Sequence, residues 1–425
     1  MAYGRDVFDL RERLGAVRDG RQNPVTPAAV VAAAIFFCGL LRIRSLNALE
    51  PRLREKPLMR LVDPGSKLKT LCSADTISRS LRGTDLATTR ALSVGIVAQA
   101  ERNKVFREGW HGALRYVALD GWEPVTSMSR HCRGCLVREL QVKQRDGTLA
   151  TVEQYYHRYV VAMLIDERFD LALDIEPLLP ADLRPGPAGR NGEDEGELTA
   201  ARRLLRRIKK TFNWLDVVVC DGLYPNGPFL TDVKQLRMGA VIIAKKETDE
   251  PLKDALAIWG DTPSTLVTED KNTGERVELW DCPDVETLET YQGPIRVVRG
   301  RITRTHDPAA PTRTWCMVVT GKAAKLSPDK VLAVARGRWH IENTGFHQWV
   351  TRWRFAHVFV HDADGMRALY WLFFAAFNLL TLFLYRQLRS YGRDRGKDVT
   401  RTISRLIDEM LDDLARLDRS PWNTS

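Results

Sequence analysis

Two short apolar runs that each end in an aspartate followed by a glycine constrain the fold of this chain most. The first run, RYVALDG, carries Asp120, and the second, WLDVVVCDG, carries Asp221. The residues before each aspartate are continuously apolar, as is typical of strands that are buried on both faces. The sequence therefore predicts a buried sheet with an aspartate at the end of two of its strands.

A third carboxylate lies in a late segment with helical periodicity, residues 329–353. Apolar side chains recur there at three- and four-residue steps: Leu332, Trp339, Phe346, Val350 and Trp353. Arg338 and Glu342 are one turn apart on another face, and a surface ion pair is the ordinary interpretation of such spacing. The two aspartates favour another interpretation, because a triad of carboxylates can hold paired divalent metals for phosphodiester chemistry.

These motifs resemble those of the DDE insertion-sequence transposases that carry a Tyr-x2-Arg-x3-Glu-x6-Lys signature. The resembling segments are DGLY at 221–224, RWHIEN at 338–343, the apolar NLL at 378–380, HCRGCLVR at 131–138 and YYHRYV at 155–160. Arg338 and Glu342 match the signature, whereas Ala335 replaces its tyrosine and Trp349 its lysine. The resemblance covers roughly residues 110–390.

The resemblance implies an RNase H-like α/β core, in which the first strand, the fourth strand and the last helix bring three carboxylates together. The predicted elements follow that order: strands at 114–120, 159–165 and 170–175, a helix at 198–212, a strand at 216–220, a helix at 228–238 and a strand at 239–245. Four β-rich segments then form an insertion, at 264–268, 276–281, 295–303 and 313–319.

We therefore expect five regions in the chain. They are a helical N-terminal DNA-binding region at 1–110, the first part of the core at 111–245, the β-rich insertion at 246–324, the last core helices at 325–390 and a helical C-terminal tail at 391–425. The tail contains an amphipathic pattern whose role stays open between dimer contact, DNA contact and packing.

The activity implied by the resemblance is cleavage at transposon ends and strand transfer into target DNA. Asp120, Asp221 and Glu342 would bind two Mg²⁺ or Mn²⁺ ions. The partners would be double-stranded DNA, as terminal inverted repeats and target, and a second copy of the chain in a homodimeric synaptic complex. Two alternatives stay open: a nuclease on the same core, and a non-catalytic DNA-binding protein derived from a transposase.

DNA contacts are predicted first in the N-terminal region. SADTISRSLRG at 73–83 predicts a helix with Ser73 as its N-cap, and Thr76, Arg79 and Arg82 would suit phosphates or base edges. An ordinary solvated face is the alternative. The helix at 198–212 carries a further set of cations, expected to be solvated or against DNA: Arg202, Arg203, Arg206, Arg207, Lys209 and Lys210.

Further contacts are predicted around the catalytic residues. Arg338 would contact a phosphate near the cut. Trp349 lies two helical turns beyond Glu342 and would face the DNA, and Arg352 would replace the charge of the missing lysine.

Three more residues are DNA-binding candidates with strong alternatives. Trp280, in the insertion, would stack on a flipped base as in the resembling family, although a core role is also open. Lys245 and Lys246 follow the last core strand and would touch phosphates or remain solvated.

Composition agrees with a nucleic-acid partner. The chain has 425 residues, with 64 Lys and Arg against 54 Asp and Glu; the resulting charge of +10 favours a polyanion. Residues 368–385 carry no formal charge, which is near the lower limit for a membrane span, but Asn378 interrupts them and a buried core helix is favoured. We expect no membrane partner and a bacterial, reducing cytoplasm, with nucleoid association when DNA is bound.

Cys132 and Cys135 have the Cys-x2-Cys spacing of a zinc site. A second close pair is missing, so His131 or His157 would have to complete a site through folding. The sequence therefore favours two thiols in a loop.

Overall fold

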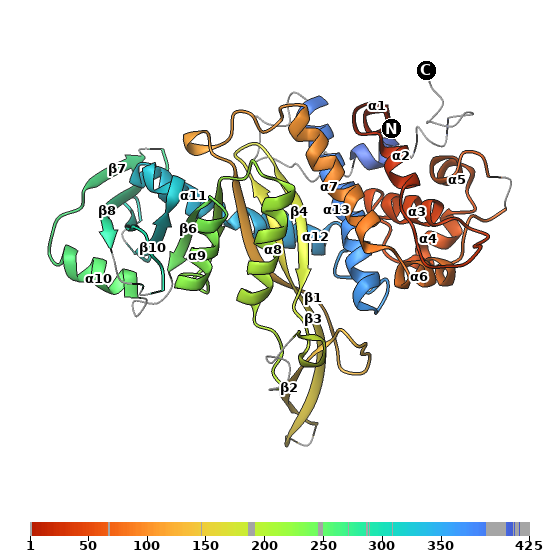
Figure 1. The fold of residues 1–425 in the computed structure, drawn as a ribbon, viewed down its shortest axis with the longest axis horizontal. Helices are drawn as coiled ribbons and strands as arrows, with labels where there is room; N and C mark the ends of the chain where they lie inside the picture. Colours follow the sequence, from red (N-terminus) through yellow and green to blue (C-terminus); the bar gives the residue numbers. More distant parts are fainter. Residues whose placement is uncertain are drawn as a thin grey trace.

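The computed structural model describes residues 2–66, 69–145, 147–185, 192–244, 250–270, 272–285, 288, 290–307, 309–387, 405–410, 412 and 416. In this part of the chain, N-terminal helices are followed by one large sheet and then by a long late helix (Figure 1). The tail at 391–425 lies mostly outside the described residues.

The N-terminal helices gather around the late helix α13 (Ala363–Gln387), on the right in Figure 1. They are α1 (Ala2–Phe8), α2 (Leu10–Gly15), α3 (Ala28–Leu40), α4 (Leu46–Arg52), α5 (Lys56–Val62), α6 (Ala74–Arg82) and α7 (Leu86–Arg102). Helix α3 is apolar on nearly every face and is buried from Val31 onward. As predicted, Ser73 caps α6, because its side chain accepts a hydrogen bond from the Thr76 backbone N–H at 3.2 Å.

Five strands form the centre of the sheet in the order β4-β3-β1-β5-β6. They are β1 (Tyr116–Ser127), β3 (Leu149–Ile165), β4 (Asp170–Pro177), β5 (Val217–Cys220) and β6 (Gly239–Ala244). Strand β3 is antiparallel to β1 and β4, whereas β5 and β6 run parallel to β1. The predicted helices are present as α8 (Glu197–Thr211) and α9 (Gly227–Gln235), and short 3-10 turns occupy His111–Ala113 and Ala181–Leu183.

One strand of this part was not predicted. Strand β2 (Leu136–Lys143) pairs with the first half of β3, and the two form a ribbon that extends downward from the sheet in Figure 1. Most of the β2 side chains are exposed. A ribbon with two solvated faces needs no apolar run, so its sequence gave little signal.

The four segments predicted for the insertion are strands that extend the same sheet. They are β7 (Leu266–Asp270), β8 (Glu275–Val285), β9 (Ile295–Arg304) and β10 (Arg313–Thr320), preceded by α10 (Glu250–Trp259) and followed by a 3-10 turn, Gly321–Lys325. Strand β10 pairs antiparallel with β6, and the sheet continues through β9 and β8 to β7. The β-rich segment is therefore continuous with the core sheet.

The segment predicted as one amphipathic helix over 329–353 is interrupted. It comprises α11 (Pro328–Gly337), a π-helix at Ile341–His347 and the short α12 (Gln348–Thr351). Because a π-helix closes its hydrogen bonds five residues apart instead of four, the apolar positions no longer share a face. Leu332 and Trp353 are buried, but Trp339 is 47% exposed and Val350 is 41% exposed.

Helix α13 contains the run without formal charges. It is long and apolar enough to cross a membrane, yet 83% of the relevant stretch is buried inside the structure. Its Asn378 is hydrogen-bonded to the backbone of β4. The Asn378 side chain accepts a hydrogen bond from the Ala172 N–H at 2.9 Å and donates one to the Ala172 carbonyl at 2.7 Å. These bonds explain why an asparagine interrupts the run, and they fit the predicted core helix.

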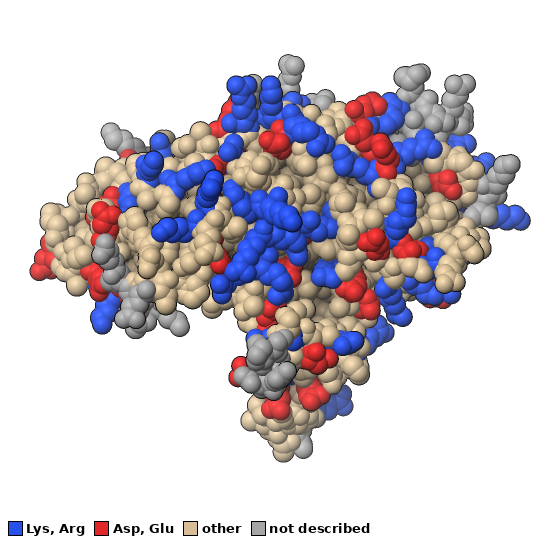
Figure 2. Space-filling view, viewed as in Figure 1, with Lys and Arg blue, Asp and Glu red and all other residues tan. Residues whose placement is uncertain are grey.

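Four arginines of the predicted positive face on α8 are partly exposed and paired with carboxylates. Arg202 and Arg206 both pair with Asp232, while Arg203 and Arg207 both pair with Glu176. Figure 2 shows Lys and Arg side chains concentrated over the middle of this face, where α8 lies in Figure 1. Carboxylates beneath the four α8 arginines offset much of their charge.

Asp174 joins the N-terminal helices to the sheet. Its side chain, which has no exposed surface, accepts hydrogen bonds from Arg90 of α7 at 2.8 Å, Arg207 of α8 at 2.9 Å and Trp371 of α13 at 2.9 Å. One carboxylate of β4 therefore connects three helices.

Candidate active site

The sheet places Asp120 and Asp221 side by side. Strands β1 and β5 are parallel neighbours with Ala118 opposite Val219, so the two aspartates follow two residues later on adjacent strands. Asp221 comes directly after β5, as predicted. Asp120 is not at a strand end, because β1 continues to Ser127 in its pairing with β3.

Arg338, at the end of α11, connects Asp120 to the late helical segment. Its Nη1 donates to Asp120 Oδ2 at 2.8 Å, and its Nη2 donates to Glu342 Oε1 at 2.6 Å. The guanidinium is nearly buried between them. The ion pair between Arg338 and Glu342, which was the ordinary interpretation of their spacing, thus exists, but the nearly buried Arg338 also joins it to Asp120 of the sheet.

A fourth carboxylate, Glu197, lies at this site and was not predicted. It accepts hydrogen bonds from the Tyr224 hydroxyl at 2.9 Å and from Arg158 Nη2 at 2.7 Å. It lies so close to Gly121 that a Cβ there would collide with it. The sequence signal was weak, because Glu197 is one acidic residue at a helix start. Tyr224, in the DGLY motif, was the only pointer toward it.

The crowding of negative charge changes the acidity of these groups. Burial raises the pKa of Asp120 to about 6, the negative charges of Asp221 and Glu197 add to the rise, and Arg338 opposes it. Burial disfavours the charged form of Arg338, but Asp120, Glu342 and Asp221 outweigh it and raise its pKa. The site therefore combines the Asp120 carboxyl, which has a raised pKa, with the Arg338 guanidinium, which stays protonated.

A comparison with known families covers the segments that carry Asp221, Arg338 and Glu342. Residues 190–379 match the family model described as the transposase DDE domain. The match supports a DDE transposase. It contains Asp221, Arg338 and Glu342, and it begins after Asp120. No curated protein matches the chain.

The match also fits the fold, since a large mixed sheet with helices is what an α/β transposase would have. Enzymes of this kind process nucleic acid with divalent metal ions, so DNA is the implied substrate.

Trp349 was predicted to face DNA, and this prediction is wrong. The side chain has no exposed surface and packs against Trp122, Phe355 and Phe374. The prediction assumed two regular turns between Glu342 and Trp349, but the π-helix lies between them and changes the angle. Ala335, at the tyrosine position of the signature, is also fully buried.

None of the other predicted contacts is hydrogen-bonded to the three carboxylates in the part of the chain that the structure describes. On α6, Arg79 and Arg82 are exposed, and the Thr76 hydroxyl is hydrogen-bonded to Ser73. Trp280 is half-buried, the guanidinium groups of Arg299 and Arg301 lie over its ring, and its ring N–H donates to the Thr262 carbonyl. Arg352 is half-buried just after α12. Lys245 and Lys246 lie outside the described residues.

Proposed function

We propose that this protein is an insertion-sequence DNA transposase that cleaves at transposon ends and transfers the strands into target DNA. The observation that carries the proposal is the Arg338 bridge, which joins Asp120 of the sheet to Glu342 of the π-helix beside Asp221. Three carboxylates from distant parts of the chain therefore meet at one place. The domain match over 190–379 supports the same activity.

An RNase H-like core is the fold that we propose for residues 111–245 and 325–390. In its support, three antiparallel strands, β4, β3 and β1, are followed by the parallel strands β5 and β6. This order puts the first and fourth strands of that core next to each other, with an aspartate on each. The late segment then supplies the glutamate.

The charge balance of the site suits divalent metal ions. Asp120, Asp221, Glu342 and Glu197 bring four potential negative charges, against two positive charges from Arg338 and Arg158. Oxygen ligands with an excess of negative charge are what Mg²⁺ and Mn²⁺ prefer. We assign Asp120, Asp221 and Glu342 as the ligands of two such ions, which would activate the attacking hydroxyl and stabilise the leaving oxygen.

Other residues of the site position three of its four carboxylates. Arg338 restrains Asp120 and Glu342 through one hydrogen bond each, and the Tyr224 hydroxyl and Arg158 fix Glu197 against Gly121. In the structure Arg338 serves as the local counter-cation. Once metal neutralises the carboxylates, its guanidinium would be available to a DNA phosphate, as the resemblance implies.

We propose α6 as a contact to transposon-end DNA. Its exposed Arg79 and Arg82 are suited to phosphates, whereas the α8 arginines are occupied by Asp232 and Glu176. In this assignment the N-terminal helices recognise the end, the core cuts it, and two copies of the chain hold the two ends.

The test replaces Glu342 by glutamine in the full chain. Glu342→Gln keeps nearly the same shape, so it should bind transposon-end DNA at least as well as the parent, because one negative charge is lost near the phosphates. It should give no Mg²⁺-dependent nick. Glu139→Gln, on the exposed strand β2, is the matched control and should nick normally.

Gel shifts, nicking and strand joining are measured on one preparation of each protein. Nicking without joining by the parent would favour the nuclease, and binding without nicking would favour the non-catalytic DNA-binding protein. Full nicking by Glu342→Gln would remove the glutamate from the mechanism.

A further inference from the structure

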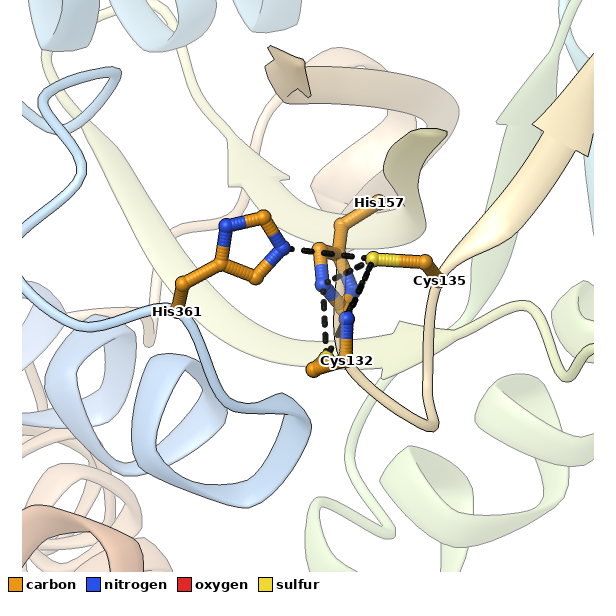
Figure 3. A group of neighbouring side chains, drawn as sticks. All are labelled: Cys132, Cys135, His157 and His361. Carbon is orange, nitrogen blue, oxygen red and sulfur yellow. Dashed lines mark hydrogen bonds between the residues drawn. The ribbon is translucent and has the colours of Figure 1, made fainter. Parts of the chain in front are cut away.

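Four metal-ligating side chains from three distant segments meet at one point outside the carboxylate site (Figure 3). Cys132 and Cys135 lie in the loop between β1 and β2, His157 lies on β3, and His361 precedes α13. All four ligand atoms lie within 4.8 Å of one another. The sequence had favoured two thiols in a loop, because only the fold brings the histidines to them.

The distances between the four ligand atoms fit a tetrahedral ion. Cys135 Sγ lies 3.9 Å from Cys132 Sγ, 3.4 Å from His157 Nε2 and 3.2 Å from His361 Nε2. Cys132 Sγ lies 3.4 Å from His157 Nε2. Ligands of a tetrahedral zinc site lie about 3.8 Å apart for two sulfurs and about 3.6 Å apart for a sulfur and a nitrogen, from the usual bond lengths.

The loop is built to present both sulfurs to this point. The Cys135 N–H donates to the Cys132 carbonyl at 3.0 Å, and the Cys132 N–H donates to Cys135 Sγ at 3.3 Å. Gly134 lets the loop reach the start of α13, because a Cβ at this position would collide with Ala363. Figure 3 shows the His361 ring and the Cys135 side chain approaching from opposite sides, with His157 and Cys132 between them.

A disulfide bond between Cys132 and Cys135 explains this cluster less well than a bound metal ion does. Bonded sulfurs are about 2 Å apart, much closer than Cys132 and Cys135 are. A disulfide would also give no reason for two imidazole nitrogens to approach the same sulfur. Cys135 and His157 are both buried, and a cation shared by all four groups satisfies their polar atoms together.

We propose that Cys132, Cys135, His157 and His361 bind one structural Zn²⁺ ion in a closed tetrahedral site. Two thiolates and two imidazoles are the ligand set that favours zinc over Mg²⁺ or Mn²⁺, which prefer the carboxylate oxygens of the other site. Four protein ligands leave no position for a substrate, so the ion stabilises structure and takes no part in the cut.

The ion would fix a pocket beside α6. Residues 129–131 of the cysteine loop line this pocket together with residues 358–361, and Ser78 and Arg82 of α6 complete it. The loop segment on one side of the pocket is followed directly by the ligand Cys132. The segment 358–361 on the other side contains the ligand His361. The zinc site therefore holds Arg130 near Arg82, and if the proposed function is right, it shapes part of the DNA-binding surface.

Metal content tests the site without relying on catalysis. The full chain is purified from zinc-supplemented medium without an affinity tag that binds metal, and its zinc is measured after release by a mercurial. We expect one zinc per chain, and less than a fifth of that in Cys135→Ser and His361→Asn. His131→Asn and Cys316→Ser are the matched controls, since His131 is exposed beside the loop and Cys316 lies on β10; both should keep the ion.

A conservative replacement guards against simple misfolding. His361→Cys gives three cysteines and one histidine, a set that also binds zinc, so it should recover the metal that His361→Asn loses. Cobalt in place of zinc should give the visible absorption of a tetrahedral thiolate site. A parent without zinc, or full zinc in both Cys135→Ser and His361→Asn, would overturn the proposal.

DNA binding separates this inference from the proposed function. Cys135→Ser should bind transposon-end DNA at least tenfold more weakly than Cys316→Ser at equal salt. Zinc loss with unchanged DNA affinity would overturn the role in the DNA surface while the metal site stands. Zinc bound normally by a parent that binds no transposon-end DNA would count against the proposed function and leave the metal site intact.

Discussion

At the scale of single residues, burial and like charge act together on Asp120. Its ordinary pKa of 3.8 is raised to about 6, first by burial and then by Asp221 and Glu197. Because the pKa is higher in the folded than in the unfolded chain, the stability of the metal-free fold falls as the pH rises from 3.8 to about 6, and the full cost remains above that range. A cation bound by the proposed ligands would offset this cost. The pKa of Asp120 and the affinity of the site for metal therefore depend on each other.

Metal affinity should therefore fall on acidification. Protonation of Asp120 competes with the ion, so Mn²⁺ should bind about tenfold more weakly at pH 5 than at pH 7.5. Isothermal titration calorimetry across this range measures the change. Asp120→Asn is the control and should bind weakly at both pH values. A midpoint near pH 4 in the parent would contradict a raised pKa.

The burial of Trp349 gives a second residue-scale prediction. Trp349→Lys puts a charge into an aromatic cluster and should destabilise the protein by about 4 kcal/mol or more. Trp339→Lys, at a 47% exposed position in the same segment, should change stability by less than about 0.5 kcal/mol. Thermal unfolding of both variants measures the difference. Equal stability of the two variants would contradict a core role for Trp349.

Sequence reasoning found the residues that follow strong local patterns. Asp120 and Asp221 could be predicted because apolar runs precede them, and Glu342 because its motif is distinctive. Glu197 and His361 could not, because each is isolated in the sequence and acquires its neighbours only through the fold. The misplacement of Trp349 came from assuming regular helical geometry.

At the scale of elements, buried strands were easier to predict than solvated ones. Strands β5 and β6 were predicted almost to the residue, since both are apolar along their length. The exposed β2 was missed, and the predicted β3 was too short, because the outer half of their ribbon has no apolar face. The π-helix at Ile341–His347 was missed too, although such distortions are common at functional sites.

The attachment of the N-terminal helices to the sheet can be tested at Asp174. Asp174→Asn keeps the shape but leaves Arg90 and Arg207 without their shared charge partner, which should cost about 3 kcal/mol. Glu55→Gln removes a carboxylate from a pair that is 51% exposed on both sides, and it should have almost no effect. Midpoints of thermal unfolding compare the two variants. An Asp174→Asn midpoint equal to that of the parent would show that the connection contributes little.

At the scale of the whole molecule, one sheet connects the proposed catalytic core to the β-rich segment. Strand β10 pairs with β6, and β6 pairs with β5, the strand that Asp221 directly follows. Each of the two candidate metal sites takes one ligand from the β1–β3 pair, Asp120 from β1 opposite Val161 and His157 from β3 opposite Val125. The oxygen-rich site is suited to chemistry and the sulfur- and nitrogen-rich site to stability.

The most direct test of the central claim is a crystal of the full chain soaked in Mn²⁺ and measured for anomalous scattering. The account predicts two peaks about 4 Å apart among the side chains of Asp120, Asp221 and Glu342, as in two-metal enzymes. It also predicts that Arg338 no longer bridges Asp120 and Glu342. Ordered Mn²⁺ elsewhere on the protein, with the Arg338 bridge intact and no peak at the three carboxylates, would contradict it.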